Sequence, residues 1–352
     1  MKFRHFAIAV LSLALMQAGW SLPVSAATGQ TGTKAASSSD KGRKSVRAPA
    51  KRTVKKRVSR KAAARIEARK VSLRRTPAPA ISAEDVSMEL DAAGLPHLRS
   101  AAFVVANQTT GQVIIERKSE SVLPIASITK LMTAMVVLDA GQSLTEEIAI
   151  SEGDIDTLKG TGSRLSLGTR LTREEMLHLA LMSSENRAAS ALARHYPGGE
   201  VAFVTAMNVK ARLIGLADTH FSDSTGLNPA NVSSPRDLVR MVSAATTYPL
   251  IREFSTTSER YVQIGSRTRR FGNTNSLVRS PEWEIGVSKT GYIREAGRCL
   301  VMQAWFMKQP VIIVLMDSDG RYSRTADAVR IKKWLEAAGP QRIAALAARG
   351  KG

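Results

Sequence analysis

Ser127 and Lys130 open the apolar segment SITKLMTAMVVLDA, residues 127–140. Side chains three residues apart share one face of a helix, so this hydroxyl and this ammonium group can touch. Burial disfavours the charged form of a lysine and lowers its pKa, which would let Lys130 act as a base toward Ser127. The pair alone decides little, because Ser38 and Lys41 have the same spacing in a segment that lacks large apolar residues. The alternative is an N-capping serine followed by a surface lysine.

Other common catalytic motifs are missing from the sequence. It contains no G-x-S-x-G, H-E-x-x-H, G-x-x-x-x-G-K-[ST] or G-x-G-x-x-G. The five histidines are scattered and there is one cysteine, so we expect no metal site and no cofactor. A serine enzyme without a histidine partner needs another base, and lysine is the known substitute.

Two further motifs follow Ser127 in the chain. Ser184 and Asn186 belong to the S-x-N in LMSSENRAAS, and Lys289 begins the K-T-G in GVSKTGY. Each is weak alone, and an S-x-N is more commonly a helix cap. Here, however, S-x-x-K begins an apolar helix, S-x-N follows a helical run, and Lys289 ends a strand-like run. S-x-x-K, S-D-N and K-T-G are the known motif set of penicillin-binding proteins and class A β-lactamases.

Residues from about 100 to 335 resemble the low-molecular-mass penicillin-binding proteins, which are serine D,D-peptidases of bacterial peptidoglycan. The strings ALMSSENRAASALARHYPGG and SKTGYIREAGRCLVM are most similar to their D-alanyl-D-alanine endopeptidase branch, the penicillin-binding protein 7 type. The resemblance implies an α+β, serine β-lactamase-like transpeptidase fold. In this fold, a five-stranded antiparallel sheet lies beside a helical region and the site lies between them.

The resemblance also implies a covalent mechanism. Ser127 would be the nucleophile, and Lys130 would accept its proton, with burial and the charge of Lys289 both lowering the Lys130 pKa. Ser184 would relay a proton to the leaving amine, and Asn186 would hold Lys130 and the substrate amide. The acyl-enzyme would split one difficult hydrolysis into two easier steps.

Substrate binding is implied for the K-T-G strand. Lys289 and Thr290 would receive a carboxylate of the peptide or of a β-lactam antibiotic, which would be a covalent inhibitor. Gly291 would let the substrate backbone lie along the strand. The backbone N–H groups of Ser127 and Tyr292 would form the oxyanion hole.

Three alternatives remain open. A D-alanyl-D-alanine carboxypeptidase would use the same motifs. A class A β-lactamase is disfavoured because none of the candidate glutamates stands in an E-x-x-x-N pattern: Glu200, Glu253, Glu259 and Glu282. The third is a non-catalytic peptidoglycan-binding or sensor module, against which the intact motifs argue.

The apolar pattern predicts one α+β peptidase domain over residues 85–340. Residues 100–119 indicate a hairpin around Gly111, and residues 140–280 are expected to be mostly helical. Three strand-like runs follow, and RTADAVRIKKWLEAAG predicts a final helix that stops at Gly339 and Pro340. From the short extension 341–352 we expect neither a further C-terminal domain nor a membrane anchor.

The N-terminus predicts secretion. Residues 1–26 combine the basic MKFRH, the apolar FAIAVLSLALM and small residues near Ala26, as in a cleaved signal peptide. No other run approaches ~20 apolar residues, so we expect no membrane span after cleavage and a periplasmic protein of cell-wall biogenesis. Cys299 lies in an apolar run and is expected to be a packed thiol.

Positive charge is concentrated in the predicted disordered tail and linker, residues 27–84. The net charge is +21, yet residues 28–80 alone hold 17 Lys or Arg against Asp40 and Glu67. The body is therefore nearly neutral, and a secreted chain meets envelope anions, not nucleic acid. We expect the tail to associate electrostatically with the envelope surface; the alternative is a mere spacer.

Overall fold

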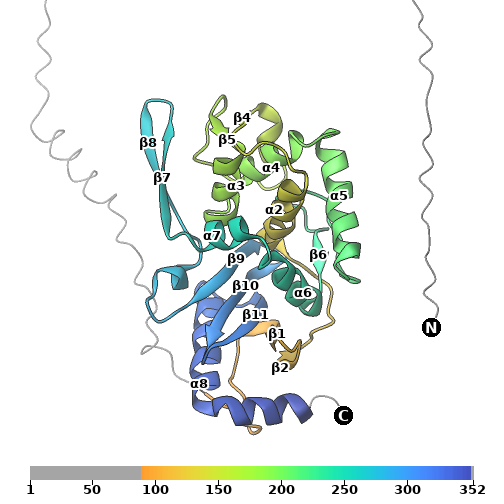
Figure 1. The fold of residues 1–352 in the computed structure, drawn as a ribbon, viewed down its shortest axis with the longest axis vertical. Coiled ribbons are helices and arrows are strands. Elements are labelled where there is room, and N and C mark those ends of the chain that lie inside the picture. The colour runs from red at the N-terminus through yellow and green to blue at the C-terminus, as the bar shows by residue number, and fades with distance from the viewer. Residues whose placement is uncertain (1–88, 350–352) are drawn as a thin grey trace, which may run out of the picture. The chain divides into compact units, whose positions relative to one another are not determined.

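The computed structural model describes residues 89–349, and its centre is one five-stranded antiparallel sheet (Figure 1). The predicted signal peptide and basic tail lie outside the described residues. The sheet has the order β2-β1-β11-β10-β9. Its strands are β1 (Ser100–Asn107), β2 (Val113–Arg117), β9 (Ile285–Ile293), β10 (Gly297–Phe306) and β11 (Gln309–Ser318).

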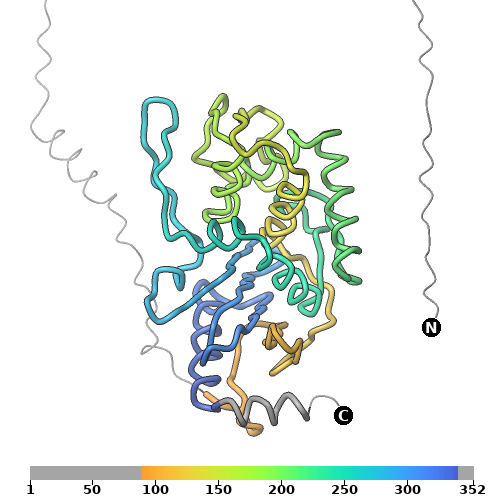
Figure 2. Tube along the Cα trace, in the orientation of Figure 1, coloured from red at the N-terminus to blue at the C-terminus, as the bar shows by residue number. Residues whose placement is uncertain are grey.

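The two ends of the folded body meet in this sheet. β1 and β2 form the predicted hairpin, and Gly111 takes a positive φ of 69° in its turn. β1 also pairs with β11, with Phe103 opposite Leu315 in the register. Figure 2 shows the early and late segments of the folded body side by side in the sheet. The predicted hairpin and the three predicted strand-like runs near the C-terminal end therefore form one sheet.

Both faces of the sheet are buried, which explains why its strands are almost continuously apolar. Successive side chains of a strand point to opposite faces. Along β11, Ile312 and Val314 join the core on the helical side, whereas Ile313 and Leu315 join a second core. The second core lies under α8 (Ser323–Arg349), which packs on β2, β10 and β11.

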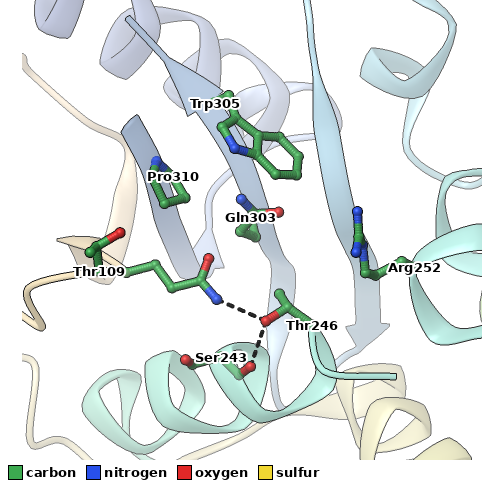
Figure 3. Close-up of a pocket in the computed structure, with 8 residues that line it drawn as sticks. Thr109, Ser243, Thr246, Arg252, Gln303, Trp305 and Pro310 are labelled. Carbon is green, nitrogen blue, oxygen red and sulfur yellow. Dashed lines mark hydrogen bonds between the residues drawn. The ribbon is translucent and has the colours of Figure 1, made fainter. Parts of the chain in front are cut away.

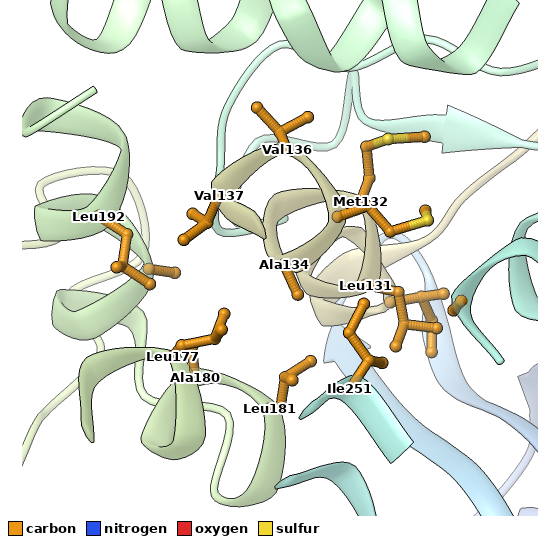
Figure 4. Close-up of a cluster of buried hydrophobic side chains, with 14 of the residues drawn as sticks. Leu131, Met132, Ala134, Val136, Val137, Leu177, Ala180, Leu181, Leu192 and Ile251 are labelled. Carbon is orange, nitrogen blue, oxygen red and sulfur yellow. The ribbon is translucent and has the colours of Figure 1, made fainter. Parts of the chain in front are cut away.

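The helical region surrounds α2 (Lys130–Asp139), whose apolar residues contact neighbours on all sides (Figure 4). A helix that is apolar all round must be buried, and α2 is. Its neighbours are α3 (Arg173–Met182), α4 (Asn186–Arg194), α5 (Gly199–Leu213), α6 (Pro235–Ala245) and α7 (Pro249–Thr256). A capping box begins α3: Thr172 Oγ1 accepts from the Glu175 N–H at 3.1 Å.

The region 140–280 is less helical than predicted. It contains the hairpin of β7 (Glu259–Ile264) and β8 (Arg267–Gly272), which extends away from the sheet in Figure 1. Short strand pairs also join β4 (Glu147–Ala149) to β5 (Arg170–Thr172) and β3 (Leu123–Pro124) to β6 (Val232–Ser233). In residues 259–272, the sequence signal for a hairpin was the strand-like segment ERYVQI followed by Gly265, and not a helical periodicity of apolar residues.

The final helix is interrupted where the sequence predicts it. Gly339 has a non-helical φ of 69° and ψ of 163° inside α8. Residues 341–349 of the C-terminal extension are helical again. Among residues 89–349, no helix has the length and apolar character needed to cross a membrane.

Candidate active site

Ser127 lies in a tight turn directly before the central helix. The turn is the 3₁₀ helix η1 (Ala126–Thr129), and Lys130 is the first residue of α2. Ala126 has a positive φ of 48°, a strained conformation for a residue with a side chain. The strained turn places Ser127 Oγ 2.9 Å from Lys130 Nζ, which donates to it.

Lys130 is fully buried and is held by three acceptors. Besides Ser127, its Nζ donates to Asn186 Oδ1 at 2.8 Å and to the Thr225 carbonyl at 2.6 Å. Burial lowers the pKa of Lys130 to about 7, although the negative charges of Asp223 and Glu185 act to raise it. A lysine with this pKa is half deprotonated near neutral pH, so it can accept a proton.

Ser184 and Asn186 lie where α3 gives way to α4. Ser184 has a positive φ of 60°. It is not a helix cap, because the N-cap of α4 is Glu185, which makes no capping hydrogen bond. Instead, Ser184 Oγ accepts from Lys289 Nζ at 2.9 Å.

The middle residue of the S-E-N motif stays outside the site. Glu185 is buried, and its carboxylate accepts hydrogen bonds from Ser163 Oγ at 2.7 Å and Arg164 Nε at 3.1 Å. On the other side, Asn186 Nδ2 donates to Thr161 Oγ1 at 2.9 Å. Glutamate in this position therefore leaves Ser184 and Asn186 free to face Lys289 and Lys130.

Lys289 lies in the middle of β9, not at the end of a strand as the sequence analysis expected. Its Nζ also donates to the Thr290 carbonyl at 2.9 Å. The Lys289 pKa lies well below its usual value, first because of burial and then because of the charges of Lys130 and Arg324. The charges of the two buried lysines repel each other, and this repulsion disfavours the charged form of both, as expected.

Two glycines bring other segments against the Ser127 turn. A side chain at Gly291 would place its Cβ 2.8 Å from the Ile125 carbonyl oxygen, so β9 approaches the turn only because residue 291 has none. Gly226 has a φ of 80°, and its Cβ would lie 1.9 Å from the Ala126 carbonyl oxygen. Gly291 therefore allows β9 to pack closely against the turn that carries Ser127. This role is additional to the expected one, which was to leave space for the substrate backbone.

A cavity of about 260 Å³ opens above these groups. Six of the eight predicted site residues line it, and the two buried lysines reach its serines from beneath. Tyr292 is 56% exposed, with the Arg298 guanidinium 4.5 Å from its ring centre. The cavity is lined by Ser127, Thr161, Ser184, Asn186, Leu227, Thr274, Thr290, Gly291, Tyr292 and Arg324.

Four polar residues of the site were missed from the sequence. Thr161 and Thr225 contact Asn186 and Lys130, and Thr274 Oγ1 accepts from Thr290 Oγ1 at 2.6 Å. Arg324 Nη1, at the start of α8, donates to the Gly291 carbonyl at 2.8 Å. The turn-forming string DSTG gave some signal for Thr225, but nothing in the sequence singles out an arginine of a terminal helix.

The remaining reactive side chains are packed away from this cavity. Cys299 is buried as predicted, and burial raises the pKa of its thiol to about 11. His178 stacks on Phe254, and its Nδ1 accepts from Arg260 Nη1 at 2.9 Å. Within residues 89–349, no group of three or more His, Cys, Asp and Glu side chains is placed to hold a metal ion.

The fold that carries this serine–lysine site is similar to solved structures of DD-peptidases and DD-transpeptidases. The DD-transpeptidase of Streptomyces K15 matches 68% of this chain and 97% of its own, with a TM-score of 0.64 and 28% identity. The penicillin-binding-protein-like fold expected from the sequence is therefore confirmed.

Sequence comparison defines the family. Residues 89–320 match Peptidase_S11, described as D-alanyl-D-alanine carboxypeptidase, and the chain belongs to this family. A D-alanyl-D-alanine endopeptidase of Pseudomonas aeruginosa is 47% identical over 249 residues, which cover 69% of this chain and 80% of the relative. The D-alanyl-D-alanine endopeptidase of Escherichia coli is 45% identical over 246 residues, covering 69% and 79%.

Proposed function

We propose that this chain is a serine D-alanyl-D-alanine endopeptidase that cleaves D-alanyl–diaminopimelate cross-links of bacterial peptidoglycan. The observation that carries the proposal is the buried Lys130, with a pKa of about 7, bonded to Ser127 at the floor of an open cavity. The names of the relatives at 45–47% identity support the choice of bond.

In the first step, neutral Lys130 accepts the Ser127 proton while Ser127 Oγ attacks the D-alanyl carbonyl carbon. The 2.9 Å contact between Nζ and Oγ supports this transfer, because a base must lie within hydrogen-bond reach. Asn186 and the Thr225 carbonyl hold the lysine in place. Such general-base help contributes ~10²–10⁴-fold to a rate.

The oxyanion that forms is stabilised by the backbone N–H groups of Ser127 and Tyr292. β9 is an edge strand of its sheet, so alternate backbone groups have no strand partner. The Thr290 carbonyl points to Lys289 at this free edge, and Tyr292, two residues on, directs its N–H the same way. One such donor contributes about 3 to 4 kcal/mol in comparable sites.

Collapse of the intermediate breaks the C–N bond and leaves an acyl ester on Ser127. Through Ser184, whose Oγ lies 2.9 Å from Lys289 Nζ, the leaving amine takes the proton that Lys130 removed from Ser127, and Lys130 is neutral again. Water then attacks the ester carbonyl carbon, and Lys130 accepts the water proton and passes it to Ser127 Oγ as the ester C–O bond breaks. The two steps return Ser127 and Lys130 to their starting states.

Lys289, Thr290 and Arg324 form the carboxylate-binding end of the cavity. Arg324 keeps a pKa of about 10 despite its burial, so it is positively charged at neutral pH. A substrate carboxylate beside Lys289 favours the charged lysine and so reverses part of the lowering of its pKa. Diaminopimelate of a cross-link carries such a carboxylate next to the bond that is cut.

Cross-linked muropeptides test the choice of bond. Incubation should convert dimeric muropeptides into monomers, as measured by mass spectrometry. Release of free D-alanine with the dimers untouched would instead support a D-alanyl-D-alanine carboxypeptidase, the activity in the family's description. A non-catalytic binding module would not be acylated by a fluorescent penicillin, whereas a D,D-peptidase would.

We also propose that residues 1–26 direct secretion to the periplasm and that residues 28–80 tether the mature enzyme to the envelope. Each basic residue near an anionic surface contributes about 1 kcal/mol, so partial engagement of the 17 Lys and Arg in this segment is enough. Within the periplasm, the enzyme would act in cell-wall biogenesis and the control of cell shape.

A further inference from the structure

A second groove, of about 390 Å³, shares no lining residue with the catalytic cavity (Figure 3). It lies where β10 ends and β11 begins, beside the end of α6 and the start of α7. Its lining residues are Gln108, Thr109, Ser243, Thr246, Arg252, Gln303, Trp305 and Pro310. None of them is acidic.

Gln303 is the unusual residue of the groove. It sits in the middle of β10, paired with Val287 and Ile312 among apolar neighbours, and is only 2% exposed. Its side-chain amide makes no hydrogen bond to any residue between 89 and 349. The amide borders the groove and has no protein partner there, so a ligand seated in the groove can complete its hydrogen bonds.

Gly286 shows that this wall depends on a glycine in β9. The backbone there does not require glycine, because Gly286 is absent from the residues with positive φ. A side chain at 286 would place its Cβ 2.0 Å from Gln303 Oε1 and 2.7 Å from the Trp305 ring. The glycine therefore makes room for the amide and the indole to lie side by side.

Arg252 supplies the charge of the groove. Its side chain is exposed and forms no ion pair with the described residues, 89–349. On the opposite wall, Gln108 Nε2 donates to Thr246 Oγ1 at 2.8 Å, and Thr246 Oγ1 donates to the Ser243 carbonyl at 2.6 Å. These hydrogen bonds hold one wall of the groove in place. On the other wall, the side chains of Arg252 and Gln303 are available to bind a ligand.

We infer that this groove binds an N-acetylated, carboxylate-bearing sugar of peptidoglycan glycan strands from which the stem peptide has been removed, because an attached stem peptide converts that carboxylate into an amide. The Arg252 guanidinium meets the carboxylate, the Gln303 amide pairs with the acetamido group, and Trp305 packs on the sugar ring. An unpaired guanidinium, an unpaired amide and an aromatic wall match this combination of groups in one compact ligand. The inference rests on the proposed function, since peptidoglycan supplies the sugar.

The test is a titration of the full chain with N-acetylmuramic acid, followed by NMR of the tryptophan indole N–H signals. The Trp305 signal, assigned by its loss in Trp305→Phe, should shift and saturate. Arg252→Ala should weaken binding about tenfold, because it removes a charge-assisted hydrogen bond. Gln303→Leu, of similar volume, should also weaken it, and the exposed hairpin change Arg269→Ala should not.

Other ligands identify the group that is recognised. N-acetylglucosamine lacks the carboxylate, so its weaker binding should not respond to Arg252→Ala. The inference is overturned if neither sugar gives a saturable Trp305 shift or if Arg252→Ala leaves N-acetylmuramic acid binding unchanged. It is also overturned if a stem peptide without sugar saturates Trp305 more tightly, which would make the peptide the source of the carboxylate.

Penicillin separates this inference from the proposed function. Protein acylated at Ser127 should still bind N-acetylmuramic acid, because the two cavities share no residue. Loss of sugar binding on acylation would place the sugar in the catalytic cavity and overturn the inference. Failure of the wild-type chain to react with penicillin would refute the proposed function, whatever the sugar titration shows.

Discussion

Raising the pH from 5 to 8 should accelerate acylation of Ser127 by a penicillin, with a plateau above neutrality. The cause is Lys130, whose pKa is lowered to about 7 by burial and which is active as a base only when neutral. Below this pKa, each pH unit changes the neutral fraction about tenfold. Above it, most of the lysine is already neutral and the rate should level off.

The magnitude follows from the pKa. The neutral fraction of Lys130 is about 1% at pH 5 and about 90% at pH 8, so the rate should rise about ninetyfold. A lysine with the usual pKa of 10.5 would give about a thousandfold rise over the same range and no plateau. The shape of the profile therefore distinguishes a buried base from an exposed one.

Stopped-flow measurement of the second-order acylation rate with a fluorescent penicillin gives this profile. Lys130→Arg should slow acylation at least ~100-fold and remove the step near pH 7, because guanidinium cannot accept a proton. Lys289→Arg keeps a positive charge and should be milder. A flat profile, a rise without a plateau, or equal losses in the two variants would refute the assignment of Lys130 as base.

Other predictions concern stability and location. Gly226→Ala should lower the free energy of unfolding in urea by about 2–5 kcal/mol, since it combines a positive φ with a clash against Ala126. The control Gly111→Ala, with no atom within 4 Å, should cost only about 1–2 kcal/mol; equal losses would contradict the clash. Burial, and then Arg260, lower the pKa of His178 from 6.5 to about 4, so the unfolded chain gains a proton between these pH values that the folded chain does not. The wild type should therefore lose up to about 3 kcal/mol as the pH falls through that window, and His178→Gln should lose less; an unchanged pH dependence would exclude His178 as the cause. The mature chain should sediment with sacculi at low salt and be released near 1 M, whereas a chain starting at Ser82 should stay in solution; equal sedimentation of both at low salt would exclude the tail as tether.

The sequence predicted those parts of the site that depend on residue type and order. Ser127 and Lys130 touch because i and i+3 share a face, a local rule that needs no tertiary information. The fold class followed from apolar runs at both ends of the body. Assigning Ser184 and Lys289 to the same site required the known set of three motifs. No local sequence pattern relates two residues that are 105 positions apart.

What the sequence missed depends on packing between distant segments. The Thr225 carbonyl and Arg324 enter the site through chain folding that residue spacing does not specify. The effect of Lys130 on the Lys289 pKa depends on how deeply each is buried, which only the structure shows. Gln303 lies in an apolar strand-like run, and only the packing around Gly286 shows that its amide lies beside Trp305 on the wall of a groove.

Intact-mass and peptide-mapping mass spectrometry of the penicillin-treated chain tests the central claim most directly. The account predicts one penicilloyl adduct per molecule, located on Ser127 and absent from the Ser127→Ala variant. An adduct on Ser184, an adduct that persists in Ser127→Ala, or no adduct on the wild-type chain would contradict it.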